Sequence, residues 1–181
     1  MDGPFVQTAP LLAFSARVES PIAFLDRDGV LNLGKAGYVN RPEEVELLKG
    51  AAQTVASLRE QGYLICVVTN QSPIARGLWG PDRLELLHAT LQERLLEEDP
   101  GAHIDAFLTC PHRYEDRCSC RKPSPAMLLL GHHLLRGEAE LTPSFSPALY
   151  SLDAPYVNWW GAKPIPSHPL DLMVGDRTSD M

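Results

Sequence analysis

Residues 63–68 form an unbroken apolar run that ends abruptly at Thr69. A strand that is buried on both faces of a parallel sheet has this composition, because helices cover such a sheet on either side. Shorter, mainly apolar segments that also end at polar or turn residues lie at 22–25, 104–108 and 170–174, the last two with one aspartate each. These runs predict a layered sheet, which limits the possible folds more than any other feature of the chain.

Between these runs, apolar residues recur at helical spacing. Ala51, Val55 and Leu58 share one face of a predicted helix, and Gly62 follows as a suitable C-terminal residue. The same spacing recurs in segments 81–95 and 124–134. Alternating strands and helices predict an α/β fold with a doubly wound parallel sheet. In this architecture, ligands bind at the carboxyl ends of the strands.

The 181 residues are enough for one domain with its own core. We assign residues 21–181 to this domain, residues 1–20 to an N-terminal extension, and the proline-rich residues 138–169 to an irregular insertion. The net charge of −7 offers no general attraction to nucleic acid or anionic membranes. No apolar run is long enough to span a bilayer, and the N-terminus is a poor signal peptide. We therefore expect a cytoplasmic monomer without nucleic-acid or membrane partners.

Acidic side chains gather where two of the predicted strands end. Asp26 and Asp28 follow the first strand, and Gly29 allows the backbone to turn sharply behind them. Two carboxylates in one crevice can divide the work, one as a nucleophile and the other as a proton donor. Asp176 and Asp180 follow the last strand and offer the oxygen ligands that Mg²⁺ prefers.

Neutral and positive groups complete this predicted site. Thr69 and Asn70 provide hydrogen-bond donors after the second strand, and Lys122 provides a compact positive charge. Each of these motifs alone is ordinary turn chemistry. Their combination at strand ends indicates phosphoryl transfer, in which catalysis consists mainly of positioning and charge neutralisation.

A second cluster has the composition of a metal centre. Cys110, His112, Cys118 and Cys120 lie within eleven positions. Thiolates and an imidazole suit tetrahedral Zn²⁺, and four protein ligands leave no open position, so the predicted zinc site is structural. The alternatives are a chance cluster of reduced thiols and a disulfide, which a cytosolic location disfavours. Cys66 lies in the apolar run and is interpreted as an inert core thiol.

Four segments together carry a family resemblance. They are FLDRDGVLN at 24–32, VTNQ at 68–71, RKP at 121–123 and VGDRTSD at 174–180. In this order they resemble the four motifs of haloacid dehalogenase-type phosphatases, whose Rossmann-like fold would here carry a zinc loop and no large cap. Within that superfamily the chain is similar to the heptose bisphosphate phosphatases, with histidinol-phosphate phosphatases as close kin. The resemblance covers roughly residues 21–136 and 170–181.

The resemblance implies a Mg²⁺-dependent hydrolase of phosphate monoesters. Asp26 would attack phosphorus and form an aspartyl-phosphate, and Asp28 would protonate the leaving sugar oxygen and then activate water. Thr69 and Lys122 would hold the transferring phosphoryl oxygens. The implied Mg²⁺ ligands are Asp26, the backbone carbonyl of Asp28, and Asp176, with Asp180 supporting either the metal or the lysine.

The resemblance also implies a substrate, D-glycero-D-manno-heptose 1,7-bisphosphate, which would lose its 7-phosphate. The implied substrate contacts are Asn32, Gly37, Tyr38, Asn70, Arg76, Arg121 and Arg177. Arg76 can meet a second phosphate, but a solvated loop arginine explains it equally well, and Pro73 stands where this loop usually has a glycine. The histidines at 88, 103, 132, 133 and 168 have no ligand spacing, so we expect surface or helix-face positions.

Two departures from the family keep alternatives open. Residues 138–169 lengthen the spacing between the third and fourth motifs, and the family continues past its fourth motif with a helix and at least one strand, which we expect to be missing here. The alternatives are a histidinol-phosphate phosphatase and a truncated, inactive, zinc-stabilised binding module. A 3′-phosphatase of DNA ends shares the Thr-Asn-Gln motif, but the zinc loop and the acidic charge argue against it.

Overall fold

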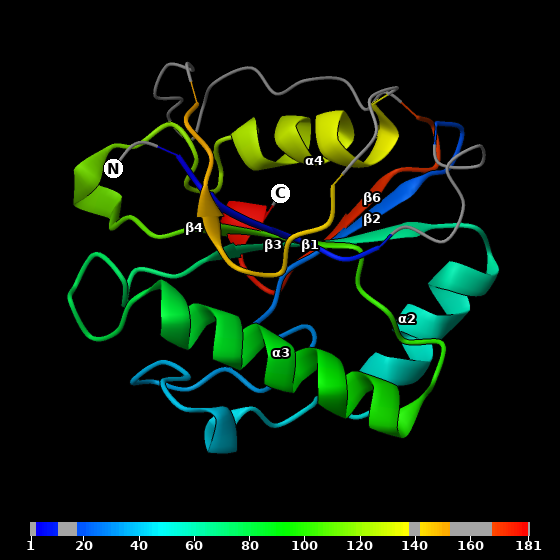
Figure 1. The fold of residues 1–181 in the computed structure, drawn as a ribbon, viewed down its shortest axis with the longest axis horizontal. Helices are drawn as coiled ribbons and strands as arrows, with labels where there is room; N and C mark the ends of the chain where they lie inside the picture. Colours follow the sequence, from blue (N-terminus) through cyan, green and yellow to red (C-terminus); the bar gives the residue numbers. More distant parts are fainter. Residues whose placement is uncertain (1–2, 11–17, 138–141, 153–167, 181) are drawn as a thin grey trace.

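A computed structural model of the chain describes residues 3–10, 18–137, 142–152 and 168–180. A six-stranded sheet in the order β5-β1-β4-β3-β2-β6 forms its centre (Figure 1). The strands are β1 (Phe5–Thr8), β2 (Ile22–Leu25), β3 (Leu64–Asn70), β4 (Ala106–Cys110), β5 (Ala148–Leu149) and β6 (Leu172–Val174). The helices are α2 (Ala51–Glu60), α3 (Pro81–Glu98) and α4 (Ala126–Arg136), with 3-10 helices η1 (Pro42–Glu44), η2 (Tyr114–Asp116) and η3 (Thr178–Asp180). None of the described helices is long and apolar enough to cross a membrane.

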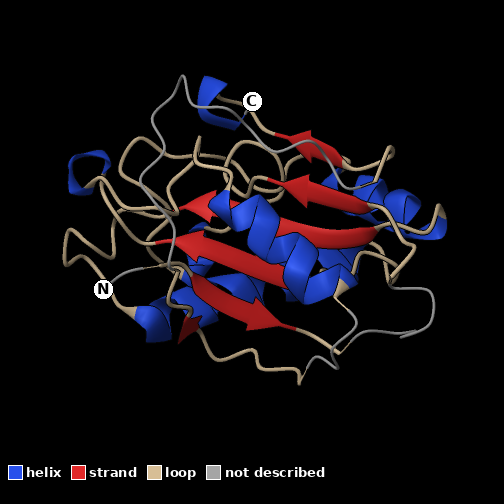
Figure 2. Cartoon of the chain, turned by 90° about the horizontal axis from the view of Figure 1, so that it is seen from above, coloured by secondary structure: helices blue, strands red, loops and turns tan. Residues whose placement is uncertain are grey.

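Four strands form the parallel part of the sheet. Strand β2 pairs with β3 and β6, and β3 pairs with β4, all in parallel. Strand β1 instead runs antiparallel to β4, and β5 runs antiparallel to β1. Figure 2 shows the arrow of β1 pointing against those of the four parallel strands. The predicted parallel sheet is therefore confirmed for its four motif-bearing strands, while the whole sheet is mixed.

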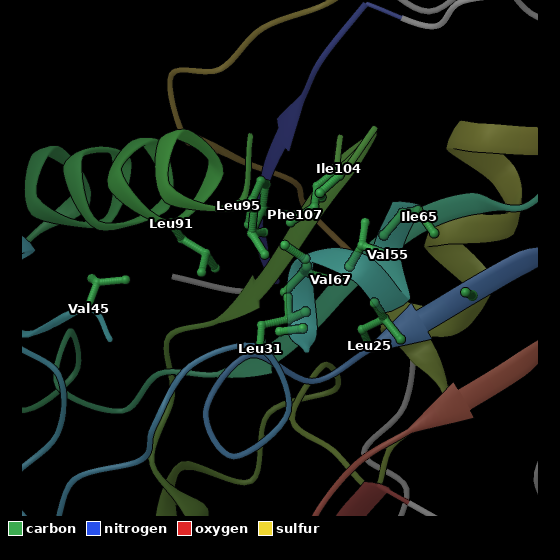
Figure 3. Packing of buried hydrophobic residues seen from close by; sticks show 14 of the residues in the cluster. Leu25, Leu31, Val45, Val55, Ile65, Val67, Leu91, Leu95, Ile104 and Phe107 are labelled. Atoms are coloured by element: carbon green, nitrogen blue, oxygen red, sulfur yellow. The ribbon is translucent and has the colours of Figure 1, made fainter. Parts of the chain in front are cut away.

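Helices cover the sheet on both faces, with α2 and α3 on one side and α4 on the other (Figure 1). Successive side chains of a strand point to opposite faces. Leu25 and Val67 accordingly belong to the core under α2 and α3, where Figure 3 shows Leu95 and Val55 beside them. Phe24 and its neighbours on the other face pack in the core of α4. Burial on both faces explains the continuous apolar runs of the sequence.

The expectation that residues 1–20 form a plain extension is wrong for residues 5–8. These residues form β1, with Phe5 opposite Thr109 and Thr8 opposite Ala106 of β4. Phe5, Gln7 and Thr8 are buried. Strand β1 covers the backbone edge that β4 would otherwise expose, which explains why so short a segment is held in the sheet.

The proline-rich residues 138–169 also contribute to the sheet, although we expected an irregular insertion. Within them, β5 places Ala148 opposite Val6 of β1. Phe145 packs edge-on against Phe107 of β4, with ring centroids 5.9 Å apart. Residues 138–141 and 153–167 of this stretch lie outside the described part.

Strand β4 begins at Ala106, two residues later than predicted, because the backbone of Ile104 bonds to a side chain of α3 and not to a neighbouring strand. The Ile104 N–H donates to Oε1 of Gln92 in α3 at 2.8 Å. The Asp105 carboxylate that follows accepts from the Ile65 N–H and from Arg59, both at 2.8 Å. As a result, Cys110 is the last residue of β4 and lies at the edge where the other motifs end.

Candidate active site

The parallel strands end at one side of the sheet, and a pocket of about 370 Å³ opens there. Asp26 follows β2 directly, Asn70 ends β3, and Asp176 comes two residues after β6. Between β2 and α2 the one helical element is the short η1, so no large cap covers the pocket from this described connection. The side chains at the strand ends are therefore open to a small ligand.

Asp26 is held at the base of this pocket with 7% of its surface exposed. Its Oδ1 accepts from the Arg27 N–H at 2.7 Å and lies 3.1 Å from Nζ of Lys122. Burial raises the pKa of Asp26, and the charge of Lys122 opposes this rise. A carboxylate fixed beside one cation has the arrangement that an in-line nucleophile needs.

The carboxylate of Asp28 is surrounded by donors. Gly29 makes the backbone turn after Asp28 possible with a φ of 86°. Oδ1 accepts from Arg27 Nε at 3.1 Å and from Asn32 Nδ2 at 2.9 Å. Oδ2 accepts from Arg27 Nη2 at 3.0 Å and from Gln71 Nε2 at 2.8 Å. Burial alone would raise the pKa of Asp28, but Arg27 and these hydrogen bonds lower it to about 2.

Lys122 connects the acidic groups of the site. Its ammonium forms an ion pair with Asp180 as well as with Asp26. The side-chain amide of Asn70 donates to the carbonyl of Lys122 and accepts from its N–H. The hydroxyl of Thr69 is buried beside the pocket and accepts from Gln71 at 2.9 Å.

The carboxylates of Asp26, Asp176 and Asp180 form the described acidic cluster that suits a hard cation. One oxygen of each lies within 4.8 Å of the others. Three carboxylate oxygens at this separation fit Mg²⁺, which binds oxygen ligands and keeps several waters. The Asp28 side chain is outside this group, so only its backbone carbonyl remains available for the Mg²⁺ role implied by the resemblance.

The Cys/His cluster has the geometry of a tetrahedral site. Its Sγ atoms are 3.2 to 3.8 Å apart, and Nδ1 of His112 lies 3.5 Å from Cys110 and 3.4 Å from Cys120. Zn²⁺ with ligands at about 2.0–2.3 Å separates neighbouring ligand atoms by about 3.5–3.8 Å in a tetrahedron. All four cysteines of the chain are free thiols, so the cluster fits zinc and not a disulfide.

The loop that carries the Cys/His cluster leads directly into the basic residues of the pocket. Arg121 follows Cys120 and donates from Nη1 to the carbonyl of His112 at 2.8 Å. Lys122 comes next and reaches Asp26. Metal binding at the four ligands would therefore fix the approach of both basic side chains.

The structure brings together five of the seven expected substrate contacts. Tyr38, Asn70, Arg76, Arg121 and Arg177 line the pocket. Gly37 and Asn32 are not among its lining residues, and Asn32 is fully occupied behind it as a donor to Asp28 and Leu33. Residues that we did not expect also line it, namely Gly34, Lys35, Ser72, Tyr114, Thr178 and Ser179.

Two residues beside Asp28 have roles that the pattern did not indicate. Arg27 is 2% exposed and pairs with Asp28, and Gln71 bridges Asp28 to Thr69. Both lie within the recognised motifs, and the charge of Arg27, two residues after a buried strand, is a signal that could have indicated a buried partner.

Comparisons with known proteins agree with this arrangement, although no protein-family model matches the chain. The D-glycero-beta-D-manno-heptose-1,7-bisphosphate 7-phosphatase of Pseudomonas aeruginosa is 39% identical over 113 residues, which cover 62% of each chain. The corresponding alpha-specific enzyme of Mycobacterium tuberculosis is 42% identical over 113 residues, 61% of this chain and 58% of that protein. The chain thus spans about three fifths of the length of these curated relatives.

A solved structure gives the same result. The D,D-heptose 1,7-bisphosphate phosphatase of B. bronchiseptica, crystallised with magnesium and phosphate, superposes with a TM-score of 0.58 at 35% identity. The match covers 62% of both chains. The predicted α/β fold and the resemblance to heptose bisphosphate phosphatases are therefore confirmed.

Proposed function

We propose that this chain is a Mg²⁺-dependent phosphatase that removes the 7-phosphate of D-glycero-D-manno-heptose 1,7-bisphosphate. The observation that carries the proposal is the position of Asp26, buried at the base of the pocket, beside Lys122 and within the acidic cluster. The names of the relatives support the substrate, and the magnesium and phosphate of the B. bronchiseptica structure support the cofactor and the chemistry.

In the proposed reaction, Asp26 attacks the phosphorus and forms an aspartyl-phosphate while the sugar alcohol leaves. Lys122, which follows the Cys/His cluster in the loop between β4 and α4, and Thr69, near the end of β3, hold oxygens of the transferring phosphoryl group. Asp176 and Asp180, with Asp26 and the Asp28 carbonyl, would hold Mg²⁺, which when bound neutralises charge that develops on the phosphoryl oxygens.

Asp28 transfers the protons. It protonates the leaving oxygen in the first half of the reaction and accepts a proton from the hydrolytic water in the second. Its low pKa keeps the carboxylate ionised in the substrate-free chain, as the second half requires. A phosphate dianion in the pocket raises the pKa of a neighbouring carboxyl, because like charges disfavour ionisation, and so favours the first half.

The basic residues at the mouth of the pocket suit a substrate with two phosphates. Lys35, Arg76, Arg121 and Arg177 line it in addition to Lys122. One phosphate would lie at Asp26, and the second would be met by side chains of this set. We also propose that the structural metal of the Cys/His cluster is zinc, and that the enzyme is a cytoplasmic monomer that binds neither nucleic acid nor membranes.

Phosphate release from the purified chain with Mg²⁺ tests the proposal. The substrates are the two anomers of the heptose bisphosphate, histidinol phosphate and a 3′-phosphate DNA, each with the chain and with Asp26→Asn. We expect turnover of the heptose bisphosphate that Asp26→Asn abolishes. Faster turnover of histidinol phosphate would favour that alternative, and zinc binding without turnover of any substrate would favour a binding module.

A further inference from the structure

A line of buried polar side chains runs from the N-terminal strand to Asp28. Gln7 of β1 donates from Nε2 to the carbonyl of Phe145 at 2.9 Å. Nδ1 of His88, in α3, lies 2.6 Å from Oε1 of Gln7. Nε2 of the same ring lies 3.4 Å from Nη1 of Arg27, whose other two nitrogens bind Asp28. Gln7, His88 and Arg27 are all at most 2% exposed, so the line is shielded from water.

The chemistry of its ends fixes the direction of every hydrogen bond in this line. A backbone carbonyl only accepts, so the amide nitrogen of Gln7 faces Phe145 and its oxygen faces His88. The ring must then donate from Nδ1, which leaves Nε2 with a lone pair. Because a guanidinium only donates, Nε2 accepts from Arg27. The ring is therefore neutral. Burial, and to a smaller extent the charge of Arg27, lower the pKa of His88, which agrees with a neutral ring.

We propose that His88, fixed by Gln7, is a positioning residue for Asp28: it anchors the third nitrogen of Arg27 and thereby holds the other two on the proton-transferring carboxylate. The proposal rests on the proposed function of Asp28. It corrects the expectation of a surface position for His88, which lies on the buried face of α3 and stacks on Phe107 with centroids 4.3 Å apart.

The line connects two segments that the motifs do not include. Gln7 comes from residues 1–20 and Phe145 from residues 138–169, and both reach Arg27 through one ring of α3. With two nitrogens on Asp28 and no partner for the third, the Arg27 guanidinium could still rotate about its side-chain bonds. The acceptor at Nε2 of His88 removes that freedom, so the Asp28 carboxylate keeps one orientation relative to the leaving oxygen.

The test compares substrates whose leaving groups differ. A sugar alkoxide needs a proton from Asp28 to leave, whereas p-nitrophenolate does not. We measure kcat/KM, which reports the steps up to loss of the alcohol, for the heptose bisphosphate and for p-nitrophenyl phosphate. His88→Phe keeps the stacked ring and removes both hydrogen bonds. It is expected to lower kcat/KM about tenfold or more for the sugar and less than about twofold for the aryl phosphate.

Two variants and a control keep the result interpretable. His88→Gln offers an oxygen near the position of Nε2 and should restore sugar turnover to within about threefold of wild type. Gln7→Met removes the anchor of the ring, together with the hydrogen bond to the Phe145 carbonyl, and leaves the His88 ring itself in place. It should show the same substrate-dependent loss, even if His88→Phe fails to fold. His133→Gln, on the exposed side of α4, should leave both substrates unchanged. A parallel loss for both substrates, or no loss for either, would overturn the proposal.

A measurement without turnover separates this proposal from the proposed function. If the wild type hydrolyses neither substrate, the function is wrong, but ¹⁵N spectra still report on the line. We expect a proton on Nδ1 of His88 at neutral pH, and an Arg27 Nε proton that exchanges with water at least about tenfold faster in Gln7→Met. A proton on Nε2, or unchanged exchange, would contradict the positioning role.

Discussion

Asn70 and Lys122 hold each other through a reciprocal pair of hydrogen bonds. The Lys122 N–H donates to Oδ1 of Asn70 at 3.0 Å, and Nδ2 of Asn70 donates to the Lys122 carbonyl at 3.2 Å. The two residues are separated by 52 positions and belong to different motifs. The end of β3 thereby fixes the backbone from which the ammonium reaches Asp26. We expected Asn70 to contact the substrate. Its amide is engaged with the backbone of Lys122, and the contact with substrate stays a prediction.

Replacing Asn70 by alanine should therefore act on catalysis through Lys122. Asn70→Ala removes two hydrogen bonds, each worth about 1 kcal/mol, and frees the lysine backbone. We expect kcat for phosphate release to fall about tenfold or more while the free energy of unfolding falls by about 1–2 kcal/mol. Thr90→Ala removes one hydrogen bond on the exposed side of α3 and should keep the wild-type kcat. A wild-type kcat in Asn70→Ala would contradict the role.

Removing one ligand of the Cys/His cluster should release the metal and loosen the basic residues after it. Cys118→Ser loses a thiolate from a site whose geometry fits zinc. We expect the zinc content, measured by elemental analysis, to fall from one per chain to well below one, and phosphate release to fall with it. Cys66→Ala is the matched control, because Cys66 is buried in β3 away from the cluster, where burial raises the pKa of its thiol. Unchanged zinc and unchanged kinetics in Cys118→Ser would refute the assignment.

The motif-bearing strands were predictable because burial leaves a local mark on the sequence. Residues 64–68 are apolar without interruption since helices cover both faces of the sheet there. The polar residues after each strand indicated the position of the site, because the burial of apolar side chains ends where the strands end. Residue type and spacing also predicted the Cys/His cluster as a candidate metal site, since its four members lie within eleven positions.

Other features depend on partners that are distant in the sequence. Strand β1 has four residues, one of them the polar Gln7, and only its pairing with β4 makes it a strand. The acceptor of the Gln7 amide lies 138 positions away, at Phe145. Arg27 carries no visible indication that its partner is a histidine 61 positions further on. Periodicity reports on burial near a residue, and it carries no information about which side chain completes a polar contact.

The carboxylate of Asp171 holds the start of β6, so its loss should lower the stability of the fold. It accepts from the Ile22 N–H at 2.7 Å and from both terminal nitrogens of Arg136 at 2.6 Å. Strand β6, which leads to Asp176, begins at the next residue. We expect Asp171→Ala to lower the free energy of unfolding by about 1–3 kcal/mol and Asp171→Asn, which still accepts from Ile22, to lower it less. Denaturant titration checks this order, and equal losses in both variants would argue against the contact with Ile22.

Gly29 and Gly50 have nearly the same φ and different surroundings, so together they test the place of Asp176 in the acidic cluster. Their φ values are 86° and 84°, and an alanine at either position costs about 1 kcal/mol of backbone strain. A Cβ on Gly50 would meet nothing within 4 Å, whereas one on Gly29 would collide with the Asp176 carboxylate. Gly29→Ala should therefore displace this ligand and weaken Mg²⁺ binding, measured by calorimetry, about tenfold or more. Gly50→Ala should lose similar stability from its backbone and keep wild-type Mg²⁺ affinity. Equal Mg²⁺ affinities in the two variants would show that Asp176 does not bind the metal from this position.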